Sequence, residues 1–204
     1  MSKLHDRRQR HDVFYRRAKQ ESFAARSVYK LLEIDRRFRL LRAGQRVLDL
    51  GCRPGSWLQH AVERVGERGH VVGLDRKPLD IALPPNATVV VGDVLTIDPQ
   101  ELLAALPEYR RSCFQVVLSD MAPDTSGVAF TDQVRSLELF GRAMDLAQRL
   151  GCPQSSLCGK LFMGEGFEEI VGALRQLYEQ VKIVRPEATR RSSTEVYLVG
   201  LQRR

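Results

Sequence analysis

The stretch that decides the fold is Arg46-Val47-Leu48-Asp49-Leu50-Gly51-Cys52-Arg53-Pro54-Gly55-Ser56-Trp57. Its first five residues are mostly apolar and predict a short strand, which runs directly into a turn that holds Gly51 and Gly55. A helix is expected to follow to about residue 65. Glycines permit a tight turn and allow a ligand to approach the backbone closely. A strand, a glycine turn and a helix in this order indicate the first unit of a parallel α/β sheet.

The rest of the chain alternates strands with helices. We expect one or two helices within 13–38, helices at 98–106, 132–150 and 167–179, and strands at 46–50, 70–74, 88–91, 114–119, 155–162, 181–184 and 195–201. Asp98 is expected to cap its helix, with Pro99 in the first position. This alternation predicts an α/β, Rossmann-like fold whose seven-stranded sheet is mostly parallel and has helices on both faces. Only about ten residues separate the last two strands, too few for a parallel crossover, so the last strand is expected to be antiparallel.

The charge of the chain is concentrated near the N-terminus. Residues 1–46 hold 14 Lys or Arg against five acids, whereas the formal net charge of all 204 residues is only +7. A basic arm on a nearly neutral body favours a polyanionic partner, first nucleic acid and second an anionic membrane surface. The alternative is a solvated helix face that only keeps the protein soluble.

Composition excludes several classes of protein. Hydrophobic residues make up 43% of the chain, enough for a core, but no apolar run is long enough to span a membrane. The polar N-terminus has no apolar segment typical of a secretory signal. Four scattered cysteines without a CxxC pair predict reduced thiols and no structural zinc site. We therefore expect a cytoplasmic protein.

Acidic residues follow three successive predicted strands. Asp75, Asp93 and Asp120 stand at strand ends that share one edge of a parallel sheet. Asp75 is placed to bind ribose hydroxyls and Asp93 to accept a hydrogen bond from an adenine amino group, although each could instead cap its own turn. Arg53 replaces the second glycine of a pyrophosphate-binding turn, so S-adenosylmethionine fits this pattern better than NAD.

Four further segments carry a family resemblance. They are Ala25-Arg26-Ser27-Val28-Tyr29-Lys30-Leu31, Val117-Leu118-Ser119-Asp120-Met121-Ala122-Pro123, Gly159-Lys160-Leu161-Phe162 with Gly164-Glu165-Gly166-Phe167, and Arg190-Arg191-Ser192-Ser193-Thr194-Glu195-Val196-Tyr197. In this order, and with the glycine turn, they resemble the RrmJ/FtsJ family of RNA ribose 2′-O-methyltransferases over nearly the whole chain.

The resemblance implies a catalytic tetrad, a cofactor and a set of cofactor-binding residues. The tetrad is Lys30, Asp120, Lys160 and Glu195, with Lys160 as the proton acceptor or the group that orients the hydroxyl. The cofactor is S-adenosyl-L-methionine, and no metal is expected. Its binding residues are Gly51, Pro54, Gly55, Trp57, Asp75, Asp93 and Asp120, although Trp57 could instead belong to the core.

The protonation state of Lys160 decides whether it can act as a base. A free lysine has a pKa of about 10.4 and is only about 0.1% neutral near pH 7.4. Burial or a nearby Lys30 lowers that pKa, whereas a nearby Asp120 raises it. We hypothesise that Asp120 holds Lys160, which loses its proton only in the reactive complex.

The substrate implied by the resemblance is a uridine of large-subunit ribosomal RNA within the assembled subunit. We expect a single methyltransferase domain, 1–204, with a basic helical extension at about 1–44, no membrane contact and no obligate protein partner, hence a monomer. Phosphate contacts are expected from the extension, namely from Arg7, Arg8, Arg10, Arg16, Arg17 and Lys19. The alternatives are a tRNA ribose methyltransferase, a non-catalytic RNA-binding assembly factor and a small-molecule methyltransferase.

Overall fold

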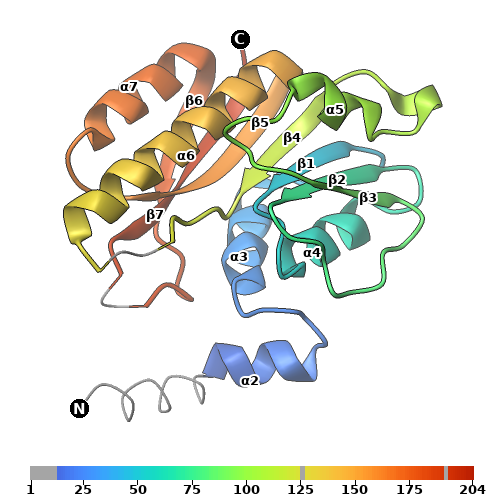
Figure 1. Cartoon of the computed structure of the whole chain (residues 1–204), viewed down its shortest axis with the longest axis horizontal. Coiled ribbons are helices and arrows are strands. Elements are labelled where there is room, and N and C mark those ends of the chain that lie inside the picture. The colour runs from blue at the N-terminus through green and yellow to red at the C-terminus, as the bar shows by residue number, and fades with distance from the viewer. Residues whose placement is uncertain (1–12, 125–126, 191–192) are drawn as a thin grey trace.

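The computed structural model describes residues 13–124, 127–190 and 193–204, and its elements alternate along the chain (Figure 1). The strands are β1 (Arg46–Leu50), β2 (His70–Asp75), β3 (Ala87–Val91), β4 (Phe114–Ser119), β5 (Gly151–Phe162), β6 (Tyr178–Val184) and β7 (Glu195–Arg203). The helices are α2 (Val13–Gln20), α3 (Val28–Phe38), α4 (Ser56–Val65), α5 (Pro99–Ala104), α6 (Ala129–Leu150) and α7 (Phe167–Leu177), with a short 3₁₀ turn at Glu108–Arg110.

The seven strands form one sheet in the order β3-β2-β1-β4-β5-β7-β6. Strand β7 is antiparallel to both of its neighbours, β5 and β6, whereas the other pairs are parallel. This arrangement confirms the predicted mostly parallel sheet with an antiparallel last strand. Strand β7 lies between β5 and β6, so it is hydrogen-bonded to a strand on each side.

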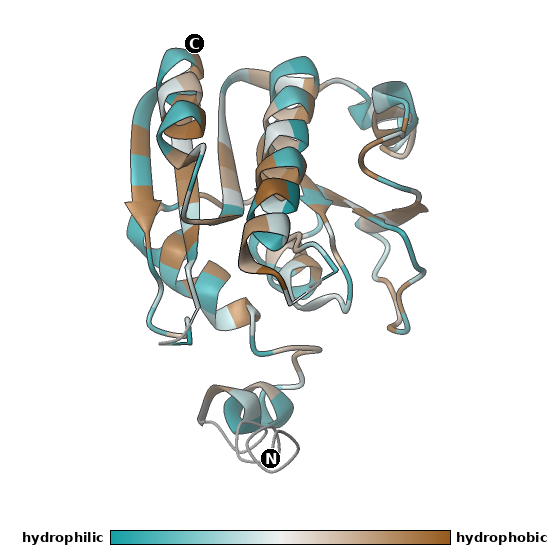
Figure 2. Cartoon of the chain, turned by 60° about the vertical axis from the view of Figure 1, so that its left-hand side comes forward, coloured by the Kyte–Doolittle hydropathy of each residue, from teal (hydrophilic) through white to brown (hydrophobic). Residues whose placement is uncertain are grey.

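Apolar residues alternate along the strands and form a core on each face of the sheet. Leu48 and Leu50 of β1 belong to the core cluster that includes buried residues of α5, α6 and α7, whereas Val47 of the same strand belongs to the cluster that includes those of α3 and α4. Figure 2 shows the corresponding alternation of hydrophobic and hydrophilic bands along the helices. The predicted helices on both faces are therefore confirmed.

The predicted elements are all present, but several boundaries differ: α6 begins at Ala129 rather than at residue 132, β5 at Gly151 rather than at 155, and β6 at Tyr178 rather than at 181. The predicted cap of α5 is present, since the Asp98 carboxylate accepts a hydrogen bond from the backbone N–H of Gln100. Helix α7, however, ends at Leu177 rather than at residue 179, because Tyr178 already belongs to β6. The buried ring of Tyr178 packs directly over Gly200 of β7, so pairing with β7 ends the helix.

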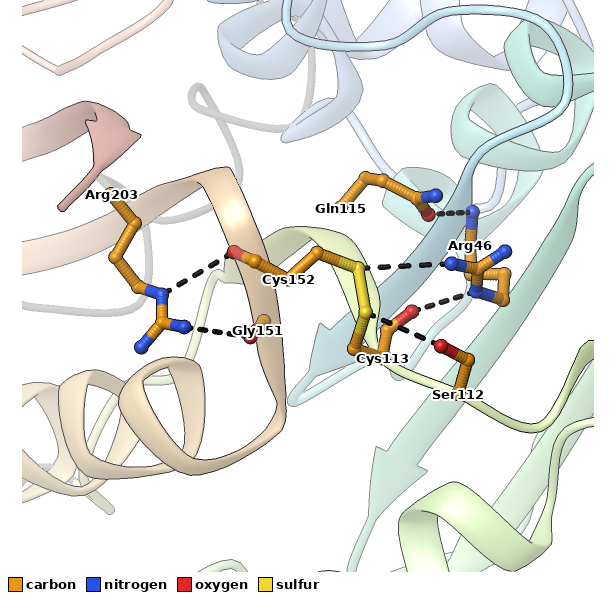
Figure 3. The surroundings of a disulfide bond; sticks show 7 residues. All are labelled: Arg46, Ser112, Cys113, Gln115, Gly151, Cys152 and Arg203. Carbon is orange, nitrogen blue, oxygen red and sulfur yellow. Dashed lines mark hydrogen bonds between the residues drawn. A yellow bond between two sulfur atoms is a disulfide. The ribbon is translucent and has the colours of Figure 1, made fainter.

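The expectation of reduced thiols is wrong for two of the four cysteines. Cys113 and Cys152 form a disulfide with a Cα–Cα distance of 5.0 Å (Figure 3). Cys113 immediately precedes β4 and Cys152 is the second residue of β5, and these strands are neighbours that begin at the same edge of the sheet. Because helix α6 separates the two cysteines in sequence, their spacing could not reveal this contact. Cys52 and Cys158 are buried free thiols.

Helix α2 lies apart from the sheet and contacts the body through few residues (Figure 1). Its Ala18 packs with Val28 and Tyr29 of α3 and with Ala188 of the β6–β7 loop. No helix in the described part of the chain is long and apolar enough to cross a membrane.

Candidate active site

A pocket of about 560 Å³ opens at the carboxyl ends of β1 to β4. Gly51, Asp75, Asp93 and Asp120, all named from the sequence as cofactor-binding residues, line it together. Helix α6 supplies Arg135 and Glu138 to the same pocket, and the loop after β4 supplies Met121 to Asp124. The edge of the sheet predicted to bind a ligand is thus the edge that is hollowed.

The backbone of Gly51 forms the floor of the pocket in a conformation that favours glycine. Its φ is +73°, and a Cβ atom at this position would lie 2.6 Å from Cγ of Met121 and 3.2 Å from the Met121 Cα. The Gly51 N–H donates to the carbonyl of Leu74 at 2.8 Å, which ties the turn to β2. A side chain here would therefore collide with the loop that carries Asp120.

The carboxylates of Asp75 and Asp93 are fixed by backbone hydrogen bonds. Asp75 accepts from the N–H groups of Arg53 and Lys77, each at 3.1 Å. Asp93 accepts from the N–H of Leu95 at 3.0 Å through one of its two oxygens. Both side chains thus cap turns and also face the pocket, so the two interpretations of these acids are compatible.

Asp49 is a buried carboxylate beneath the pocket that the sequence did not single out as functional. Its side chain is fully buried, and neither oxygen has a hydrogen-bond partner among the described residues. Burial, and to a smaller extent the negative charges of Asp120 and Asp75, together raise the pKa of Asp49 to about 8. A cation in the pocket would relieve this cost, since it favours the ionised form.

The four residues of the predicted tetrad lie together in two ion pairs. The Lys160 ammonium donates to the Asp120 carboxylate at 3.1 Å and to the Asp120 carbonyl at 2.6 Å. The Lys30 ammonium donates to the carboxylate of Glu195. All four side chains are largely buried, with the two lysines at most 10% exposed. Charges in such a position hold a fixed geometry, as a reacting centre requires.

Tyr197 joins the two ion pairs and was missed by sequence reasoning. Its hydroxyl donates to the Asp120 carboxylate at 2.7 Å, and the Lys30 ammonium lies 5.7 Å from the centroid of its ring. Burial is the main cause that raises the Tyr197 pKa well above its usual range, so the phenol stays a donor. The available signal was its position two residues after Glu195, on the same face of β7.

Two of the predicted cofactor-binding residues have structural contacts outside the pocket. Trp57 is buried, donates to the carbonyl of Ser27 at 2.9 Å and lies 5.7 Å from the Tyr197 ring. Gly55 precedes α4 with φ +114°, and a Cβ there would meet Ile81 at 2.5 Å. Neither of these residues nor Pro54 lines the pocket, whereas Arg53 lines it and pairs with Asp80.

The predicted RNA-binding residues fall into two groups. Arg16, Arg17 and Lys19 are exposed on α2, where Arg17 pairs with Glu21 at 2.7 Å. Arg7, Arg8 and Arg10 lie outside the described residues. Within the described ranges, no group of three or more His, Cys, Asp or Glu side chains is arranged to hold a metal ion.

Comparison with known proteins identifies the family. The family model for FtsJ-like methyltransferases matches residues 23–203. This chain belongs to that family. The resemblance inferred from the sequence is therefore confirmed, and the tetrad and the pocket belong to an FtsJ-like methyltransferase.

Curated relatives align with this FtsJ-like methyltransferase over nearly its whole length. A protein of Sorangium cellulosum is 50% identical over 96% of this chain and 89% of its own, and one of Myxococcus xanthus is 46% identical over 95% and 89%. Both are named "Ribosomal RNA large subunit methyltransferase E". A solved structure from Plasmodium falciparum, 24% identical, matches the fold with a TM-score of 0.77 over 89% of this chain and 98% of its own.

Proposed function

We propose that this protein transfers a methyl group from S-adenosyl-L-methionine to the 2′-hydroxyl of a uridine ribose in large-subunit ribosomal RNA. The observation that carries the proposal is the Lys160–Asp120 pair, because Asp120 lines the pocket while its carboxylate also holds the lysine. The names of the two relatives support ribosomal RNA of the large subunit as the substrate. The proposal includes action on the assembled subunit, in the cytoplasm and as a monomer.

The residues of the pocket fit a cationic nucleoside donor. Among the described residues, the buried carboxyl of Asp49 next to the pocket has no hydrogen-bond partner, and a sulfonium cation would favour its ionised form, which burial disfavours. Gly51 allows close approach to the backbone. Asp75 is proposed to hold the ribose hydroxyls and Asp93 the adenine amino group, since both line the pocket. Pro54, Gly55 and Trp57 are proposed to support the shape of the turn rather than to contact the donor.

The chemistry requires alignment of the hydroxyl oxygen and removal of its proton. When bound, S-adenosylmethionine supplies an electrophilic methyl group and a positive charge. A further positive charge in the pocket favours the neutral amine of Lys160, which can then accept the proton of the 2′-hydroxyl. Asp120 and Tyr197 fix the position of Lys160, and the Lys30–Glu195 pair orients the ribose from the other side.

The basic extension at 1–44 is proposed to bind phosphates of the RNA without reading its sequence. Arg16, Arg17 and Lys19 are exposed on α2, which packs through Ala18 against the start of α3, the helix that carries Lys30. Such contacts hold the substrate in register, while RNA shape and the 2′-hydroxyl give recognition.

The test is labelled methyl transfer to undermethylated large ribosomal subunits, with unmodified tRNA in parallel. We expect label in ribosomal RNA that is lost in Lys160→Ala and kept in Lys182→Ala, whose lysine is exposed on β6. Label in tRNA alone would overturn the proposed substrate and leave the mechanism. A folded protein that binds RNA but transfers no label would overturn the enzymatic proposal in favour of an assembly factor.

A further inference from the structure

The loop between β3 and α5 forms the wall of the pocket that is proposed to receive the adenine. Four consecutive residues of this loop line the pocket, namely Gly92, Asp93, Val94 and Leu95. Within the loop, the Asp93 carboxylate accepts from the N–H of Leu95 at 3.0 Å, and the Asp93 carbonyl accepts from the N–H of Ile97 at 2.9 Å. The direction of the Asp93 carboxylate therefore depends on the path of the loop backbone.

Arg142 of helix α6 binds the same loop backbone through two carbonyl groups. Its Nε donates to the carbonyl of Val94 and its Nη2 donates to the carbonyl of Ile97, both at 2.9 Å. Its Nη1 donates to the carboxylate of Asp145, one turn further along α6. The side chain of Arg142 is 18% exposed. One largely buried guanidinium thus joins two carbonyls that are three residues apart.

The contact depends on the shape of the guanidinium group. Arginine offers five N–H donors in a planar, fixed fork, so one side chain can bind two carbonyls and a carboxylate at once. A lysine ammonium is a compact charge at the end of a flexible stem and does not reproduce this geometry. The side chains of Val94 and Ile97 are buried in the core, so the loop is held both by its side chains and by its carbonyls.

Helix α6 also forms part of the pocket, which places Arg142 next to the proposed donor site. Glu138 and Leu139 of this helix line the pocket. They precede Arg142 by four and three residues, a spacing that puts side chains on one face of a helix. Arg142 is not itself a lining residue. Its influence on a ligand therefore passes through the loop that carries Asp93.

We propose that Arg142 is a positioning residue that sets the affinity for the adenine end of the methyl donor by holding the Asp93 loop. The inference rests on the proposed function, in which Asp93 binds the adenine amino group. Arg142 keeps the loop in its binding conformation before the donor arrives. Such preorganisation raises affinity, because binding does not have to order the loop.

The first experiment measures the binding of S-adenosylhomocysteine, the donor without its methyl group, to the full-length protein by calorimetry. Arg142→Ala removes two hydrogen bonds from a charged donor, so we expect binding to weaken about tenfold. Arg142→Lys is expected to lose less affinity. Arg149→Ala is the matched control and is expected to bind as the wild type, because Arg149 pairs with the same Asp145 but is 59% exposed.

An analogue with hypoxanthine in place of adenine tests whether the effect passes through Asp93. This analogue has a carbonyl where adenine has its amino group, so the wild type is expected to prefer adenine. Arg142→Ala is expected to lose most of that preference, whereas a general loss of stability would weaken both ligands equally. Asp93→Ala/Arg142→Ala should bind little more weakly than Asp93→Ala. An unchanged preference in Arg142→Ala, additive losses, or a wild type without the preference would each overturn the inference.

Turnover separates donor positioning from the chemical step. In methyl transfer to large subunits, Arg142→Ala is expected to raise the KM for S-adenosylmethionine about tenfold and to change kcat by less than about twofold, because the Lys160–Asp120 pair is untouched. The KM for the subunits should stay that of the wild type. A lower kcat with an unchanged KM for the donor would contradict the assigned role.

The outcomes distinguish this inference from the proposed function. Equal affinities of wild type and Arg142→Ala, with an active wild type, refute the inference alone. Weaker binding in Arg142→Ala, with a wild type that binds the donor but transfers no methyl group, keeps the inference and refutes the proposed reaction. A wild type that does not bind S-adenosylhomocysteine refutes both. Thermal unfolding verifies that the variants fold, and if Arg142→Ala does not, the affinity and adenine preference of Arg142→Lys decide.

Discussion

The hydroxyl group of Tyr197 helps to fix the position of Asp120 in the candidate active site. It donates to Asp120 at 2.7 Å, while Tyr178, buried to the same degree on β6, has a hydroxyl without a partner in the described structure. The two tyrosines can therefore be compared directly, because the hydroxyl donates a hydrogen bond to Asp120 at Tyr197 and to no described residue at Tyr178.

We expect Tyr197→Phe to lower kcat by about 10- to 100-fold, because a hydrogen bond to a charged group contributes about 1.5–3 kcal/mol. The ring, and with it the packing against Trp57, remains. Tyr178→Phe removes the unpartnered hydroxyl and is expected to leave kcat as it is. Steady-state methyl transfer measures both. Equal rates in the two variants would contradict a positioning role for Tyr197.

Asp49 makes stability depend on pH in a defined direction. Its pKa is about 8 in the folded protein and near 3.8 when exposed, so the folded state holds the proton while the unfolded state releases it between these values. Stability therefore falls by about 1.4 kcal/mol per pH unit across that window, and the cost is absent below it. An ordinary surface carboxylate would show no such slope.

We expect Asp49→Asn to remove this contribution. The difference in unfolding free energy between the variant and the wild type should grow in favour of the variant from pH 4 to pH 8 and then stay constant. Urea unfolding at a series of pH values measures it. An offset that is the same at every pH would mean that Asp49 is ionised in the folded protein.

Residues of the site differ in how far the sequence could reveal them. The tetrad followed from a motif resemblance, and the structure brings its four members together. Tyr197 and Asp49 were missed because their importance lies in what surrounds them. A tyrosine on a strand and an aspartate inside an apolar run gain meaning only when the neighbouring strands are placed.

At the level of elements, periodicity in the sequence predicted the strands and helices. It did not predict the contacts between elements that are distant in the chain. Helix α7 ended earlier than expected because pairing of Tyr178 with β7 outweighs local propensity. The disulfide between the starts of β4 and β5 had no local signal, since the two cysteines are 39 residues apart.

The disulfide joins two central strands at the end of the sheet opposite the site. In the chain-entropy picture a loop of this length contributes up to about 4 kcal/mol. We expect Cys152→Ser to lower the urea midpoint in oxidising buffer and to match the wild type treated with a reductant. Reductant should not change the variant further. If reductant does not change the urea midpoint of the wild type, this expectation is contradicted. The result also bears on the proposed location, because the cytoplasm is a reducing compartment in which disulfides are rare.

At the level of the whole molecule, positive charge is concentrated in residues 1–46, which include both α2 and α3. Residues 1–46 carry an excess of nine positive charges, while the remaining residues are nearly neutral. This division was visible in the sequence, because it needs no knowledge of contacts. The structure adds that Arg16 and Lys19 are exposed to solvent on α2.

We expect Arg16→Ala/Lys19→Ala to weaken the binding of large-subunit ribosomal RNA and to reduce its salt dependence, by counterion release from about two phosphates. The binding of S-adenosylmethionine should not change. Filter binding at several salt concentrations measures the affinity for RNA, and calorimetry measures the affinity for S-adenosylmethionine. If the slope of log K against log salt equals that of the wild type, α2 does not contact the RNA.

Strand β7 has a consequence for how the molecule comes into being during synthesis. Strands β1 to β4, whose carboxyl ends line the pocket, leave the ribosome before β7, which must insert between β5 and β6 after both have been made. The nascent chain therefore contains the residues that line the pocket, together with Lys30 and Lys160, before it contains Glu195 and Tyr197. A chain released before β7 is complete would hold Lys160 and Asp120 but would lack Glu195, which pairs with Lys30, and Tyr197, which donates to Asp120, so the site is complete only after β7 has joined the sheet.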